Sequence, residues 1–171
     1  MRIEELGELQ PDPDIREWLR SGPIQVPYFD GQELSFVIAG IDEIEGGKVR
    51  QTVTAFLKLD SKDRQAAAKH VFANYQKIAE QVKKEELGCH IESEQDVWNH
   101  VQPTEIYVSK RHRRDCGFYV QICAACEWEQ EHGLQIVYRN GNELSRVSDI
   151  DGHLTHTDAY NLPEDQDRIV S

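Results

Sequence analysis

Side chains capable of acid–base chemistry gather in one short stretch of the chain. Glu129, Glu131 and His132 directly follow Trp128. A carboxylate beside an imidazole can orient a general base, or the two groups can ligate a metal ion. The stretch also allows a structural interpretation, in which Trp128 anchors it in the core and Gly133 permits a sharp entry into a strand. We favour the structural interpretation, and the next alternative is an interaction surface formed by Trp128, Glu129, Glu131 and His132.

Two further imidazoles, His153 and His156, lie downstream of this stretch. If they converged with Glu131 and His132, the four side chains could bind a metal ion whose ligated water acts as a nucleophile. His153 and His156 are three residues apart in an expected loop, so they do not form the helical pair of zinc proteases. A metal-dependent hydrolase that uses Glu131, His132, His153 and His156 is therefore the alternative to a non-enzymatic protein.

The cysteines offer a second kind of metal site. Cys123 and Cys126 have the C-x-x-C spacing of a zinc half-site, and Cys116 and Cys89 are the remaining candidates for ligands. Residues three apart in one strand point to opposite faces, so only a turn or bulge between Cys123 and Cys126 would bring their sulfurs together. We interpret the cysteines first as reduced, buried thiols and expect no cofactor, with zinc as the alternative.

A basic run from Lys110 to Arg114 is a local exception in an acidic chain. A run of charge at a turn is most often simply solvated, and pairing with a phosphate or an acidic partner segment is the functional alternative. The chain carries no phosphate loop, no dinucleotide-binding glycine motif and no nucleophile elbow. These absences leave no complete catalytic motif in the sequence.

Bulk composition narrows the class of function. The 171 residues suit one domain and carry a formal net charge of −12. Binding to nucleic acid or to an anionic membrane depends on Lys and Arg, so this charge argues against both. It permits a basic protein partner, although solubility alone is the simpler interpretation of the charge. The first residues lack the basic and apolar regions of a signal peptide, and no apolar run is long enough to span a bilayer, so we expect a cytoplasmic protein.

Turn signals and hydrophobic periodicity predict strands at both ends of the chain and helices between them. Asp30-Gly31 and Asn140-Gly141 each separate two apolar runs, which predicts two hairpins. Apolar residues at helical spacing predict helices over 49–57 and from Ser61 to near Gly88. Shorter helices are expected at 14–19 and 96–101, and further strands at 105–108 and 118–122.

This order of elements predicts an α+β domain, with a mainly antiparallel sheet built from hairpins and two to four helices packed on one face. The composition of the two ends suggests where the domain begins and stops. We expect a polar N-terminal segment over 1–22, a single domain over 23–160 and a frayed tail over 161–171.

The region from Asp96 to Thr155 resembles a bacterial family known only as a domain of unknown function. The resemblance rests on the signature C-x-W-E-x-E-H-G-L, carried here by residues 126–134, followed by the N-G turn at 140–141 and by D-G-H-L-T at 151–155. The resemblance implies a relationship and attaches no catalytic role to these residues. By analogy alone, small acidic bacterial domains of this kind suggest an immunity or regulatory protein.

The leading hypothesis is thus a cytoplasmic, non-enzymatic module that binds another protein, of an immunity or regulatory type. It rests on the net acidity, on the lack of a complete catalytic motif and on two hairpins whose edges could be exposed. The oligomeric state is left open.

Overall fold

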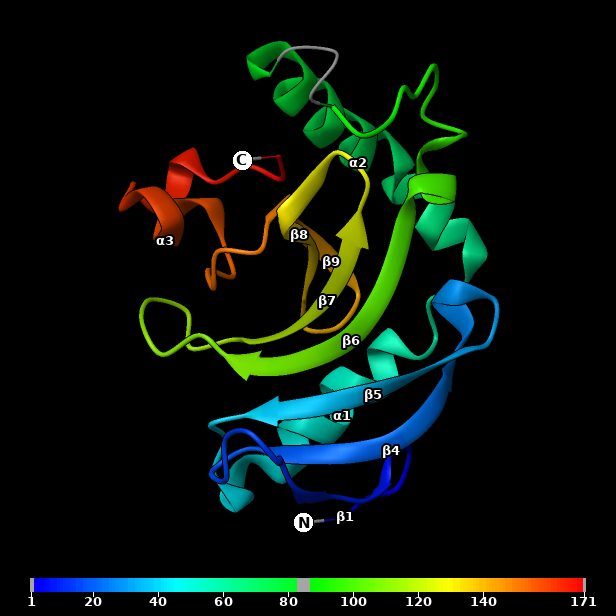
Figure 1. Ribbon diagram of the computed structural model, residues 1–171. Helices are drawn as coiled ribbons and strands as arrows, with labels where there is room; N and C mark the ends of the chain where they lie inside the picture. The colour runs from blue at the N-terminus through cyan, green and yellow to red at the C-terminus, as the bar shows by residue number, and fades with distance from the viewer. Residues whose placement is uncertain (1, 83–86, 171) are drawn as a thin grey trace.

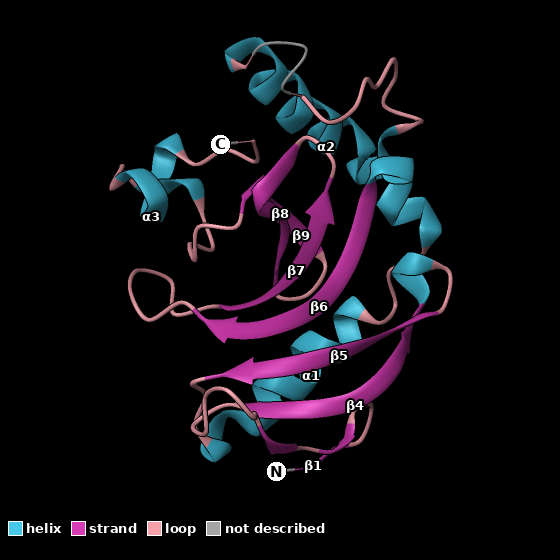
Figure 2. Cartoon of the chain, in the orientation of Figure 1, coloured by secondary structure: helices cyan, strands magenta, loops and turns pink. Residues whose placement is uncertain are grey.

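The computed structural model describes residues 2–82 and 87–170, in which a curved sheet carries helices (Figure 1). The predicted α+β class is confirmed, since one seven-stranded sheet, mostly antiparallel, accompanies a two-stranded sheet and the helices (Figure 2). None of the helices in the described residues is long and apolar enough to cross a membrane.

The main sheet has the strand order β3-β4-β5-β6-β7-β8-β9. Its neighbours pair antiparallel except β5 and β6, which run parallel. A parallel pair needs a crossover connection, and the chain between β5 and β6 contains both long helices. The strands are β1 (Arg2–Ile3), β2 (Gly7–Glu8), β3 (Gln10–Pro11), β4 (Leu19–Val26), β5 (Gln32–Ala39), β6 (Val101–Lys110), β7 (Phe118–Cys126), β8 (Glu129–Arg139) and β9 (Glu143–Asp149).

Both predicted hairpins form around residues with positive φ. Asp30 and Gly31 have φ of 54° and 85° between β4 and β5, and Asn140 and Gly141 have φ of 53° and 84° between β8 and β9. Gly141 also has a packing reason, because a Cβ built on it would lie 2.1 Å from the carbonyl oxygen of Thr52 in a helix. Position 141 must therefore be glycine, both because of its positive φ and because of its close approach to that helix.

The helix expected over 14–19 was wrong, because Leu19 is already the first residue of β4. The side chain of Asp12 accepts hydrogen bonds from the backbone N–H groups of Asp14 and Ile15, both at 3.0 Å. Such a side chain-to-backbone turn competes with helix formation. The apolar residues that suggested a helix belong instead to a turn and a strand.

The two long helices are α1 (Gly46–Phe56) and α2 (Ser61–Gln81). Asp60, rather than Ser61, caps α2, because its side chain accepts from the N–H of Lys62 while Asp63 accepts from the N–H of Asp60. This is a capping box with acidic residues at both positions. The predicted end near Gly88 is too late, since α2 ends at Gln81, and residues 83–86 lie outside the described part of the chain. The remaining elements are η1 (Pro27–Phe29), η2 (Glu43–Glu45), η3 (Val97–His100), α3 (His156–Tyr160) and η4 (Glu164–Gln166).

One face of the sheet forms the apolar core with α1 and α2. Alternate residues of β6, β7 and β8 point to this face and pair directly across the strands, as Ile106, Ile122 and Ile136 do. Phe56 and Val71 pack on them from the two helices and are fully buried. The opposite face carries the intervening residues, which include Gln121, Gln135 and Arg146.

Both ends of the chain are more tightly held than the sequence suggested. Ile3, Leu6 and Leu9 are buried in the core cluster, so the polar N-terminal segment contributes to the domain. At the other end, the N–H of Val147 in β9 donates to the carbonyl oxygen of Ile169 at 2.6 Å. We expected a frayed tail. As far as residue 170, the tail is instead ordered against the sheet, because the edge of β9 supplies a backbone partner.

Candidate functional site

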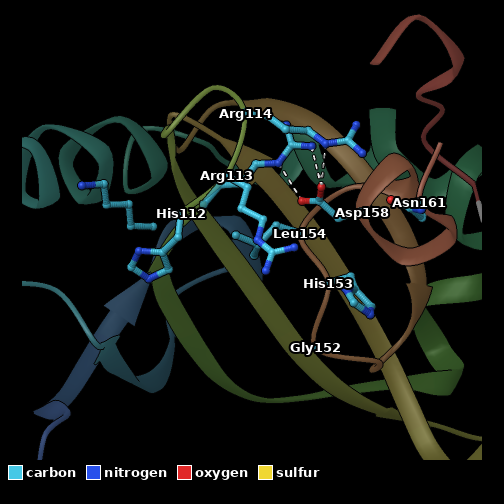
Figure 3. A pocket seen from close by; sticks show the side chains of 10 residues that line it. His112, Arg113, Arg114, Gly152, His153, Leu154, Asp158 and Asn161 are labelled. Carbon is cyan, nitrogen blue, oxygen red and sulfur yellow. Dashed lines mark hydrogen bonds and ion pairs between the residues drawn. The ribbon is translucent and has the colours of Figure 1, made fainter. Parts of the chain in front are cut away.

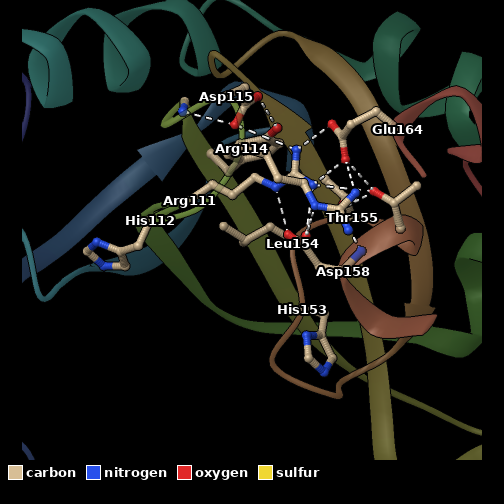
Figure 4. A network of polar contacts seen from close by, with 12 residues as sticks. Arg111, His112, Arg114, Asp115, His153, Leu154, Thr155, Asp158 and Glu164 are labelled. Carbon is tan, nitrogen blue, oxygen red and sulfur yellow. Dashed lines mark hydrogen bonds and ion pairs between the residues drawn. The ribbon is translucent and has the colours of Figure 1, made fainter. Parts of the chain in front are cut away.

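The basic turn between β6 and β7 holds the C-terminal segment through Arg111. This arginine is only 4% exposed. Its Nε and Nη2 donate to Asp158 at 2.6 and 2.8 Å, and its Nη1 and Nη2 donate to Glu164 at 3.0 and 2.9 Å (Figure 4). The hydrogen bond from Arg111 is the main cause that lowers the pKa of both carboxyl groups, to about 2 for Glu164. Two acidic residues far along the chain are thus held, ionised, against the turn.

Arg114 takes part in the same network. Its Nη1 donates to the carbonyl oxygen of Leu162 at 2.8 Å and also to the carboxylate of Glu164. Its Nε lies 3.4 Å from Asp158. The basic turn is therefore not simply solvated, because two of its arginines are paired within the molecule.

A cleft of about 470 Å³ lies between this turn and the loop that follows β9. Figure 3 shows the side chain of Arg113 extending into it between His112 and His153. Among the described residues, no hydrogen bond or ion pair is found for the Arg113 side chain, whereas Lys110 donates to Glu45 at 2.6 Å. The cleft thus offers a guanidinium and two imidazoles to an anionic group. It is lined by residues 110–114, 152–154, Asp158 and Asn161.

A buried polar network positions the other wall of the cleft. Arg146, 1% exposed, donates to both carboxylate oxygens of Asp151 at 2.7 and 2.6 Å and to the carbonyl oxygen of His153 at 2.8 Å. Gln135, fully buried, donates to Asp151 and to the same carbonyl, and accepts from Gln121 at 2.6 Å. Burial is the largest single influence on Asp151 and opposes its ionisation, but the hydrogen bonds from Arg146 and from the backbone N–H of His153, together with the charge of Arg146, hold the pKa of this carboxyl below its usual value.

This network was missed by the sequence reasoning, although a signal existed. Gln121, Gln135 and Arg146 all occupy the sheet face opposite the helices, which a one-sided sheet would leave in water. Polar residues on one face of three successive strands are compatible with a solvated face as well as with a buried one. Only the path of the chain after β9, which returns over β8 and β9, distinguishes a buried face from a solvated one.

The four side chains of the hydrolase hypothesis do not gather. Glu131 and His132 are exposed at the beginning of β8, and His153 is exposed in the loop after β9. His156 is buried at the first position of α3, where its Nε2 accepts a hydrogen bond from Arg168 at 2.9 Å. Burial and the neighbouring guanidinium lower the pKa of His156. In the described part of the chain, no set of three metal-ligand atoms within 4.8 Å of one another includes any of these four.

The residues of the expected interaction surface divide between core and solvent. Trp128 is buried, its Nε1 donates to Asn74 at 3.0 Å, and its ring meets Tyr75 edge-on at 5.9 Å. It therefore anchors the β7–β8 turn on α2 and cannot touch a partner. Glu129 accepts from the backbone N–H groups of Glu131 and His132, both at 3.1 Å, which fixes the start of β8 and leaves those two side chains exposed.

The cysteines of the C-x-x-C pair lie on different sides of the sheet. Cys126 belongs to the core on the helix side, whereas Cys123 pairs with Gln135 on the polar side. Burial raises the pKa of each thiol to about 12. Cys116 is exposed in the basic turn, and Cys89 is half-buried after α2. Across the described residues, the cluster with metal-ligand geometry is a different one, composed of Cys89, His100 and Glu127.

The two ends of β6 and β7 carry opposite charge. One end is the basic turn. At the other, Val101 pairs with Cys126, and the N–H of Glu127 donates to the carbonyl oxygen of His100. Segments 87–100 and 126–133 meet there and contain no Lys or Arg. We call this region the acidic end, and its exposed carboxylates are Glu92, Glu94, Asp96, Glu127 and Glu131. Ten residues of extended strand place it on the order of 30 Å from the basic turn.

Comparison with protein families gives one relationship. The model of the domain of unknown function DUF6985 matches residues 5–154. The chain belongs to this family. The DUF6985 match covers the strands from β2 to β9 and the helices α1 and α2, and it ends within the loop that lines the cleft. The segment that carries Asp158 and Glu164 lies beyond the matched residues. No curated protein and no solved structure matches the chain.

Proposed function

We propose that the protein is a non-enzymatic module, of an immunity or regulatory type, that binds a basic segment of another protein at its acidic end. The observation that carries the proposal is the meeting of two chain segments with five exposed carboxylates and no Lys or Arg. The net charge of −12 acts in the same direction, because its field attracts a basic partner over a longer distance than the contact itself.

The shape of the acidic end suits a contact surface. Trp128 and its hydrogen bond to Asn74 hold the β7–β8 turn on α2, so the exposed Glu127 and Glu131 project from a fixed backbone. Exposed charges contribute chiefly to the rate of association and to the choice of partner. We therefore expect binding that weakens as the salt concentration rises.

The test is affinity capture from lysate of the native host with two matched triple variants. Glu92→Gln, Glu94→Gln and Glu131→Gln remove three charges from the acidic end. Glu8→Gln, Asp14→Asn and Glu17→Gln remove three exposed charges near the N-terminus. A specific partner with a basic segment should be recovered by the wild type and the N-terminal variant and be lost from the acidic-end variant. Equal recovery by both variants, or no specific partner in repeated captures, would overturn the proposal.

A second candidate is recognition of an acidic segment of a partner protein at the cleft. The observation that favours it is Arg113, whose guanidinium lies in the cleft between two imidazoles (Figure 3). Arg113→Ala should then abolish capture of that partner, while Arg16→Ala, which removes another exposed arginine, should not. Capture that is insensitive to Arg113→Ala would exclude the cleft as the contact surface.

A further inference from the structure

We propose that Cys89, His100 and Glu127 form a binding site for Zn²⁺, with a fourth coordination position that opens into a neighbouring cavity. The ligand atoms of the three residues lie within 4.8 Å of one another. His100 Nδ1 and Glu127 Oε2 are 2.7 Å apart. The inference does not depend on the proposed partner surface, because it concerns an ion and not a protein.

Three separate backbone segments are fixed at this point. His100 and Glu127 flank the last pair of the β6–β7 ladder, Val101 and Cys126, so the antiparallel register brings them opposite each other. The backbone N–H of Glu127 donates to the carbonyl oxygen of His100 at 3.2 Å. The segment with Cys89 lies directly against this point, because a Cβ on Gly88 would lie 2.6 Å from the carbonyl oxygen of Glu127. The donor set is therefore assembled by the fold before any ion binds.

The donor chemistry points to zinc. Zn²⁺ takes sulfur, imidazole nitrogen and carboxylate oxygen at about 2.0–2.3 Å in a tetrahedral arrangement. In such a tetrahedron the imidazole nitrogen and the carboxylate oxygen lie roughly 3.3 Å apart, so a small rotation of the two side chains would admit the ion. A thiolate ligand disfavours Mg²⁺ and Ca²⁺, which prefer oxygen donors. Burial and nearby Glu127 raise the pKa of Cys89, and a coordinated ion would displace its proton.

The surroundings leave one side of the group open. A cavity of about 270 Å³ is lined by Asn99–Gln102, Ala125–Glu127 and Gln130, and it therefore includes two of the three ligands. Three protein ligands with an open fourth position are the arrangement in which a zinc ion retains a water molecule. The amide of Gln130 donates to the carbonyl oxygen of Glu127 and borders this position.

The experiment uses the untagged chain of 171 residues and Zn²⁺ alone. Zinc affinity is measured by competition with a chromogenic chelator, and stoichiometry by mass spectrometry of the metal after dialysis. Co²⁺ is then substituted, since a thiolate ligand produces a charge-transfer band in the near ultraviolet. The variants are Cys89→Ala, His100→Ala and the conservative Glu127→Gln. The matched controls are Cys116→Ala and His132→Ala, which remove an exposed thiol and an exposed imidazole elsewhere.

We expect one Zn²⁺ per chain in the wild type and in both controls. Loss of outer-shell partners already weakens metal sites by 10–100-fold, so each ligand variant should bind at least on the order of 100-fold more weakly. Cys89→Ala should also lose the cobalt charge-transfer band. Circular dichroism establishes whether each variant is folded. If His100→Ala does not fold, the conservative Glu127→Gln variant still tests the site. Wild-type protein without stoichiometric zinc, or zinc binding that persists in the folded Cys89→Ala and Glu127→Gln variants, would overturn the inference.

Discussion

Arg146 and Asp151 form a two-point ion pair, in which Nη1 and Nη2 of Arg146 lie 2.7 and 2.6 Å from the two carboxylate oxygens. The guanidinium is buried on the polar face of the sheet, and the carboxylate lies in the loop that crosses it. The pair therefore ties the loop at 151–155 to β9. One wall of the cleft owes its position to this contact.

The two partners should respond unequally to substitution. Asp151→Ala removes the carboxylate that contacts both Nη1 and Nη2 of the buried Arg146, and breaking a buried pair from one side in this way costs about 3–5 kcal/mol. Arg146→Met fills a similar volume and leaves Asp151, whose side chain is 37% exposed, able to contact water. We expect Asp151→Ala to lower the free energy of unfolding in urea by more than Arg146→Met does. Equal losses would show that the pair is not the principal anchor of the loop.

Stability should fall in acid because of the carboxylates that pair with Arg111. Glu164 has a pKa of about 2 in the folded protein against an ordinary value of 4.5. A group with a lowered folded pKa stabilises the fold fully above its ordinary pKa, and this contribution is lost as the pH falls through the folded value. We expect the free energy of unfolding to decline between pH 4.5 and about 2.

The matched variant for this pH dependence is Arg111→Ala, which removes the cause of the lowered pKa. Its unfolding free energy should be lower at neutral pH and should depend less on pH across the acidic range. Arg16→Ala serves as a control for loss of an exposed positive charge. If Arg111→Ala shows the same slope as the wild type, other carboxylates determine the acid sensitivity.

Substitution of the turn glycines separates conformation from packing. Gly141 and Gly152 both have positive φ, 84° and 78°, but only Gly141 lies against another backbone. Gly152→Ala should lower stability by about 1–2 kcal/mol, the cost of a left-handed residue with a Cβ. Gly141→Ala should lower it further, because the new methyl group would meet the carbonyl oxygen of Thr52 at 2.1 Å. Thermal melting of the two variants measures the difference, and equal shifts would exclude the packing contribution.

Thiol reactivity should follow burial. Cys123 and Cys126 are buried with pKa values raised to about 12, whereas Cys116 is exposed. The thiolate is the reactive form, so alkylation of the native protein should modify Cys116 first and the buried pair only on unfolding. Peptide mass spectrometry over a time course identifies each site. Early modification of Cys123 would show that the polar face opens readily.

Local signals in the sequence were sufficient for the class of fold and for much of its order. The Asp30-Gly31 and Asn140-Gly141 turns specify their hairpins because both residues tolerate positive φ, and the apolar stripe of residues 67–78 specifies α2. The alternation of side chains along a strand, from which we argued that Cys123 and Cys126 face opposite ways, is likewise a local property. These predictions need no knowledge of distant contacts.

The sites depended on contacts that no local signal carries. Arg111 meets Asp158 and Glu164 across 47 and 53 residues, and His100 meets Glu127 through the pairing of β6 with β7. The sequence by itself determined the α+β class, the hairpins and the excess of negative charge. Only the tertiary structure decided that the basic turn is paired, that Trp128 and Gln135 are buried and which side chains meet, because strand register and the path of the C-terminal segment bring together residues that are remote along the chain.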